Sequence, residues 1–93
     1  MEISTRELAG ARETVQAVLE ELGLSAYLFE VEFRNEAWEV RVDCATDALW
    51  QSATLTVSAP ALEAAARPGA GRRRLMGEWA PQLAACTGTP PGS

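Results

Sequence analysis

Residues 27–57 constrain the fold most strongly, because apolar and polar side chains alternate there in three consecutive runs. The runs are residues 27–33 (YLFEVEF), 38–44 (WEVRVDC) and 49–57 (LWQSATLTV). Alternation with a period of two is typical of a β-strand that has one buried face. Only short polar links separate the runs, so we predict three antiparallel strands in a meander.

A two-residue turn at Asn35-Glu36 would set the register of the first two strands. Every cross-strand pair on one face would then be apolar or nearly so: Tyr27 with Cys44, Phe29 with Val42, Val31 with Val40 and Phe33 with Trp38. A slip by one residue would turn glutamates toward the core, so this register is well specified.

The other face of the predicted sheet is mostly polar and charged. Its residues are Leu28, Glu30, Glu32, Glu39, Arg41, Asp43, Trp50, Ser52, Thr54 and Thr56, while Ala53, Leu55 and Val57 are assigned to the core face. Glu30 would oppose Arg41, which is favourable, and Glu32 would oppose Glu39, which is mildly unfavourable.

Residues 3–23 are predicted to form the first helix. Ser4 and Glu7 have the spacing of a capping box, and Ile3 and Leu8 that of a hydrophobic staple. Gly23 is placed to end the helix in a left-handed conformation. One apolar stripe at helical spacing comprises Leu8, Ala11, Val15, Val18, Leu19 and Leu22.

The C-terminal third predicts a short helix from Ser58 to about Pro68-Gly69, followed by a helical run from about Arg72 to Gly88. In the second run the apolar residues recur at the spacing of a buried helix face; they are Leu75, Met76, Trp79, Leu83 and Cys86. Pro81 should kink this run. Residues 89–93 are expected to be a disordered tail.

These elements predict a single α+β domain over residues 1–88, of order α-β-β-β-α, with both helical regions on the apolar face of the sheet. Double-stranded-RNA-binding domains use the same order of elements. That likeness extends to the order alone, since no family motif can be matched residue by residue.

Charge is distributed unevenly along the chain, whose net charge is −5. Residues 1–66 contain 12 acids and 4 bases, a net charge of −8, whereas residues 67–93 contain 4 bases and 1 acid, a net charge of +3. The acidic excess argues against nucleic acid or an anionic membrane as the partner of the whole chain.

No secretory signal or membrane-spanning stretch is apparent, so a cytoplasmic location is expected. All bases are arginine and alanine is abundant, which suggests a GC-rich bacterial coding sequence.

The chain has no histidine and two cysteines, Cys44 and Cys86, which makes catalysis, a metal site or a bound cofactor unexpected. Both cysteines fall on apolar faces. We interpret them as buried free thiols in a reducing compartment rather than as a redox pair.

Basic residues cluster at Arg67 and Arg72–Arg74, after a glycine-rich turn and at the start of a predicted helix. Free backbone N–H groups and guanidinium groups would suit a phosphate or carboxylate. The simpler interpretation is ion pairing with acids of the first helix or of a partner.

The leading functional hypothesis is a small non-enzymatic accessory or adaptor protein that binds through the open sheet face. The predicted binding residues are Leu28, Glu30, Glu32, Glu39, Arg41, Trp50 and Thr54, and the partner is another protein or a second copy of the chain. The first alternative is an RNA- or nucleotide-binding module that uses the arginine cluster. The second is a small enzyme subunit whose site forms only in an oligomer.

Overall fold

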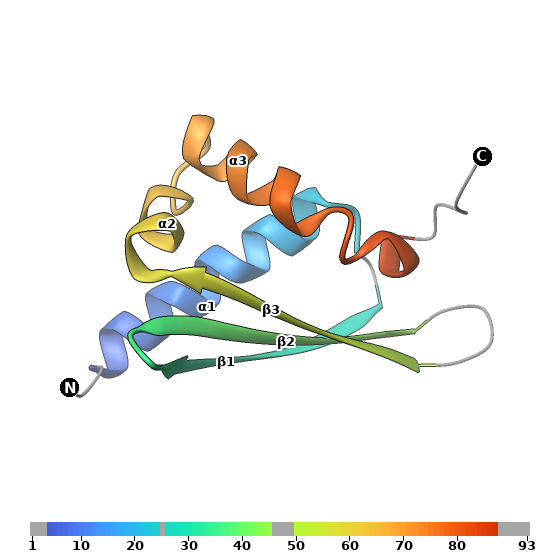
Figure 1. Ribbon diagram of the computed structural model, residues 1–93, viewed down its shortest axis with the longest axis horizontal. Coiled ribbons are helices and arrows are strands. Elements are labelled where there is room, and N and C mark those ends of the chain that lie inside the picture. The colour runs from blue at the N-terminus through green and yellow to red at the C-terminus, as the bar shows by residue number, and fades with distance from the viewer. Residues whose placement is uncertain (1–3, 25, 46–49, 88–93) are drawn as a thin grey trace.

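A computed structural model describes residues 4–24, 26–45 and 50–87. Helix α1 (Thr5–Glu21) precedes strands β1 (Tyr27–Arg34), β2 (Ala37–Ala45) and β3 (Trp50–Ser58). Helices α2 (Ala59–Ala64) and α3 (Ala70–Trp79) follow, and then the 3₁₀ helix η1 (Ala84–Thr87). The protein therefore has the predicted α+β architecture, with helices before and after one antiparallel sheet (Figure 1).

The sheet has the strand order β1-β2-β3, so β1 and β3 are its edges. All the predicted pairs between β1 and β2 are present, from Tyr27 opposite Cys44 to Phe33 opposite Trp38. The turn is two residues long, and both Asn35 (φ 53°) and Glu36 (φ 61°) have left-handed backbone conformations. Positive φ at both central positions is the geometry of a type I′ turn, which matches the twist of the strands that it joins.

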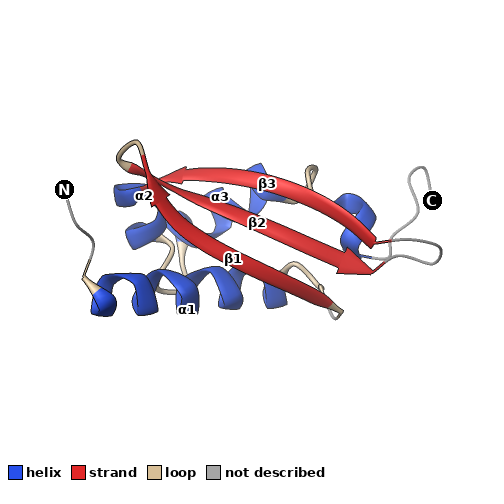
Figure 2. Ribbon diagram, turned by 90° about the horizontal axis from the view of Figure 1, so that it is seen from below, coloured by secondary structure: helices blue, strands red, loops and turns tan. Residues whose placement is uncertain are grey.

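One face of the sheet is covered by helices and the other is not (Figure 2). The core fills the space between the sheet and α1, α2 and α3. Its buried side chains include Val15, Val18 and Leu19 of α1, Trp38, Val40 and Val42 of β2, Leu55 and Val57 of β3, Leu62 of α2, and Leu75 and Trp79 of α3. Alternation in the sequence therefore assigned the strand faces correctly.

Both ends of α1 are capped by local hydrogen bonds. The Ser4 hydroxyl accepts from the Glu7 N–H at 3.1 Å and donates to the Glu7 carboxylate at 3.2 Å. At the other end Gly23 has φ 94°, its N–H donates to the Glu20 carbonyl, and the Leu24 N–H donates to the Leu19 carbonyl. These two hydrogen bonds form a Schellman motif, which confirms the prediction that Gly23 ends the first helix in a left-handed conformation. The predicted staple involves Ile3, which lies outside the described residues.

The C-terminal helices differ from prediction in two respects: α2 ends at Ala64, earlier than the predicted Pro68-Gly69, and Pro81 does not kink a longer helix. Ser58 caps α2 as expected, through a bond from the Ala61 N–H. Pro81, however, ends α3 at Trp79 instead of kinking a longer helix, so that prediction was wrong. Pro81 has no N–H to donate and its ring clashes with the carbonyl four residues earlier. Tight turns and η1 follow in place of further α-helix, and Leu83 is still buried among them. Gly88 and the predicted tail at 89–93 lie outside the described residues.

The cysteines are also not as predicted. Cys44 and Cys86 form a disulfide, with their Cα atoms 5.6 Å apart, so neither is a free thiol. Both were correctly assigned to core-facing positions. The prediction failed because the turns after Pro81 bring η1 onto the end of β2, although the two cysteines are 42 residues apart in sequence.

Candidate interaction surfaces

The uncovered side of the sheet, here called the open face, presents two large exposed apolar side chains. Leu28 is 65% exposed and Trp50 is 62% exposed. Register places Leu28 opposite Asp43 and Trp50 opposite Ala45, on the two outer strands and at the same end of the sheet. With neighbouring strands about 4.8 Å apart and a rise of about 3.4 Å per residue, this offset of two residues places the two roughly 12 Å apart across β2.

The rest of the open face is charged on β1 and β2 and polar but uncharged on β3. Arg34 pairs with Glu32 at 2.8 Å, and Arg41 lies 3.9 Å from Asp43, which also accepts a hydrogen bond from the Ser52 hydroxyl. The predicted pair of Glu30 with Arg41 is aligned across the strands, but Arg41 turns to Asp43 instead. Arg34 was not among the residues predicted on this face, although the alternation extends to it.

Two acids of the open face have no ion pair among the described residues: Glu30 on β1 and Glu39 on β2. The face contains Glu30, Glu32, Glu39 and Asp43 against Arg34 and Arg41, so it is net acidic. An apolar end and an acidic remainder thus share one surface. All seven predicted binding residues lie on it, with Thr54 on β3 opposite Arg41.

Residues of the arginine cluster differ in their burial. Arg72 is only 8% exposed. Its guanidinium donates to the Ala65 carbonyl at 2.9 Å, to the Ala66 carbonyl at 3.0 Å and to Glu21 of α1 at 2.8 Å. Ion pairing with the first helix is therefore confirmed for Arg72. Arg67, Arg73 and Arg74 are exposed.

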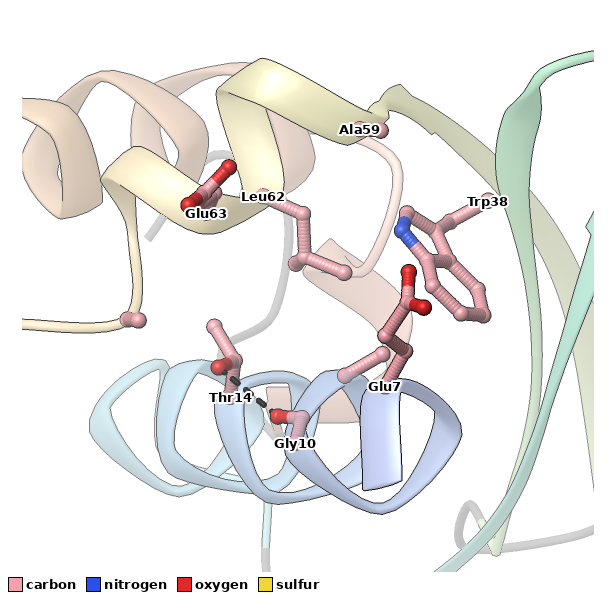
Figure 3. A pocket seen from close by; sticks show the side chains of 9 residues that line it. Glu7, Gly10, Thr14, Trp38, Ala59, Leu62 and Glu63 are labelled. Atoms are coloured by element: carbon pink, nitrogen blue, oxygen red, sulfur yellow. Dashed lines mark hydrogen bonds between the residues drawn. The ribbon is translucent and has the colours of Figure 1, made fainter. Parts of the chain in front are cut away.

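A pocket of about 320 Å³ lies between α1 and α2, on the helix-covered side of the sheet (Figure 3). Its lining residues come from three elements: Glu7, Gly10, Ala11 and Thr14 of α1, Trp38 of β2, and Ala59, Leu62 and Glu63 of α2, with Ala66 just beyond. This site could not be predicted from the sequence, because it depends on how α1 and α2 approach each other. The one local indication of a pocket was Gly10, because a glycine in the middle of a helix leaves space where a side chain would otherwise lie.

Within residues 4–24, 26–45 and 50–87, no group of three or more acidic or sulfur ligands could hold a metal ion. No helix in the same part of the chain is long and apolar enough to cross a membrane. No protein-family model, curated protein or solved structure matches the chain.

Proposed function

We propose that this protein is a small non-enzymatic adaptor that binds another protein through the open face. The observation that supports this most strongly is the exposure of Trp50 and Leu28 on a sheet face that none of the described helices covers. Aromatic side chains with a charged rim are typical of interface centres, where tryptophan contributes more binding energy than most residues.

Charge favours a basic partner over a second copy of the chain. Face-to-face pairing of two copies would bring acidic surfaces together, including the unpaired Glu30 and Glu39, and like charges at an interface are unfavourable. A partner with an apolar anchor between Leu28 and Trp50 and basic side chains over β1 and β2 would satisfy both parts of the open face.

The arginine cluster gives less support to the RNA-binding alternative. Arg72 is committed to backbone carbonyls and Glu21, which leaves Arg67, Arg73 and Arg74 for phosphate contacts. The cytoplasmic location remains a prediction. The Cys44–Cys86 disulfide counts against it, because reducing compartments keep most thiols free.

The test begins with capture of partners from the host and continues with titration of each purified partner against variants. Trp50→Ala should weaken binding about 30-fold, the equivalent of about 2 kcal/mol. Its circular dichroism should match the wild type, because the side chain is mostly exposed. Sedimentation of the protein alone would show whether a second copy binds instead.

A charge-reversal pair supplies the matched control. Glu30→Lys with Glu39→Lys should abolish binding, whereas Glu13→Lys with Glu20→Lys, at exposed positions of α1, should leave it unchanged. Equal affinity of the wild type and Trp50→Ala for every captured partner would show that the interface lies elsewhere.

A further inference from the structure

The pocket between α1 and α2 lies on the opposite side of the sheet from the open face, so the proposed adaptor function does not account for it (Figures 1 and 3). We propose that it is a binding site for a small organic cation: a protonated amine on an apolar body that also carries a hydrogen-bond acceptor. Three features of the pocket support this assignment.

The first feature is its size and apolar wall. A volume of about 320 Å³ is at the lower end of the range for small-molecule sites, roughly 300–1,000 Å³. Ala11, Leu62 and Ala66 form much of the wall. Gly10 lines the pocket and borders open space, since a Cβ built there would meet no atom within 4 Å.

The second feature is the charge of the lining. Glu7 lines the pocket from α1 and Glu63 from α2, and no basic residue is among the lining residues. The Ser4 hydroxyl bonds to one carboxylate oxygen of Glu7, which leaves the other oxygen available. Two carboxylates beside an apolar surface favour a cation that has an apolar body.

The third feature is an unsatisfied donor. Trp38 is only 5% exposed, its indole N–H has no hydrogen-bond partner among the described residues, and the nitrogen points into the pocket (Figure 3). The nitrogen is not among the fully enclosed polar atoms, so it can be reached from the pocket and can donate to a ligand acceptor. Thr14 donates its hydroxyl hydrogen to the Gly10 carbonyl, so its oxygen can still accept from a ligand N–H.

Phenylalanine amide is a suitable probe, because it combines an ammonium group, a carbonyl acceptor and a phenyl ring. We expect the Trp38 indole N–H resonance to shift on titration, with a Kd on the order of 1 mM or tighter for a ligand of this size. Uncharged N-acetylphenylalanine amide should bind at least about 3-fold more weakly, because an exposed ion pair contributes on that scale. Equal binding of the two compounds would overturn the assignment of a cation.

Glycine substitutions test the location of the site. Gly10→Leu should fill the pocket and abolish binding, and it should fold, since leucine favours helix more than glycine does. Gly77→Leu is the matched control: Gly77 is also in a helix with open space around it, but it does not line the pocket. Unchanged binding in Gly10→Leu would exclude the pocket.

Carboxylate substitutions test the charged groups. Glu7→Gln and Glu63→Gln should each weaken phenylalanine amide binding about 3-fold, and Glu13→Gln should not, because Glu13 does not line the pocket. Wild-type affinity in the Glu7→Gln, Glu63→Gln double variant would contradict the proposed role of the two acids.

Discussion

At the scale of single residues, the buried guanidinium of Arg72 has the most clearly defined role. It bonds to the carbonyls of Ala65 and Ala66, which follow the last residue of α2, and it pairs with Glu21 at the end of α1. The last carbonyls of a helix have no hydrogen-bond donor within the helix. A cationic side chain such as arginine is a favourable donor to them. One side chain on α3 thus fixes the positions of α1 and α2.

Arg72→Ala should lower the free energy of unfolding by about 2–4 kcal/mol, because it leaves carbonyl groups unsatisfied in a buried setting. Urea denaturation measures this change. Arg73→Ala and Arg74→Ala serve as controls and should stay within about 0.5 kcal/mol of the wild type, as exposed substitutions usually do. A similar loss in all three variants would mean that the cluster stabilises the fold by net charge alone.

At the scale of elements, the β1–β2 hairpin combines a strongly specified register with a strained turn. Glu36 has φ 61°, a left-handed conformation that costs a residue with a Cβ roughly 1–2 kcal/mol. The cross-strand pairs from Phe33 with Trp38 to Tyr27 with Cys44 hold the turn in this conformation.

Glu36→Gly should therefore stabilise the protein by about 0.5–1 kcal/mol, after allowance for the greater entropy of glycine in the unfolded chain. Thermal or urea unfolding tests this. Glu36→Ala removes the same carboxylate but keeps a Cβ, so it should give no such gain. If the alanine variant gains as much as the glycine variant, charge and not backbone strain is the cause.

At the scale of the whole molecule, the disulfide ties the end of the sheet to the C-terminal region. Cys44 lies at the end of β2 and Cys86 in η1, and 42 residues separate them. A cross-link over a loop of this length restricts the unfolded chain, and such restriction is worth roughly 2–4 kcal/mol. The bond therefore stabilises the folded protein relative to the unfolded chain.

Reduction, or replacement of both cysteines by alanine, should lower the free energy of unfolding by about 2–4 kcal/mol. Denaturant titration with and without reductant provides the measurement. A thiol reagent should find no reactive cysteine in protein that is unfolded without reductant. Reaction of two thiols per chain under those conditions would show that the cysteines are not bonded.

The sequence alone determined the parts of this protein that depend on neighbours in the chain. Alternation in residues 27–57 and the two-residue link at Asn35-Glu36 predicted the register of β1 and β2, because a slip by one residue would bury glutamates. Ser4 and Gly23 predicted the ends of α1, because a cap acts within a few residues. Trp50 was placed on the open face by the same alternation.

Only the tertiary structure decided how distant segments meet. The disulfide, the burial of Arg72 against α1 and the pocket between α1 and α2 all depend on contacts between segments far apart in sequence. Local pattern could not show whether Pro81 would kink a helix or end it, because the packing of Leu83 and Cys86 beyond it favours turns and η1 over a continued helix. The sequence shows which side chains are present, but only folding brings Cys44 to Cys86 and Arg72 to Glu21, and it is this proximity that decides what each of them does.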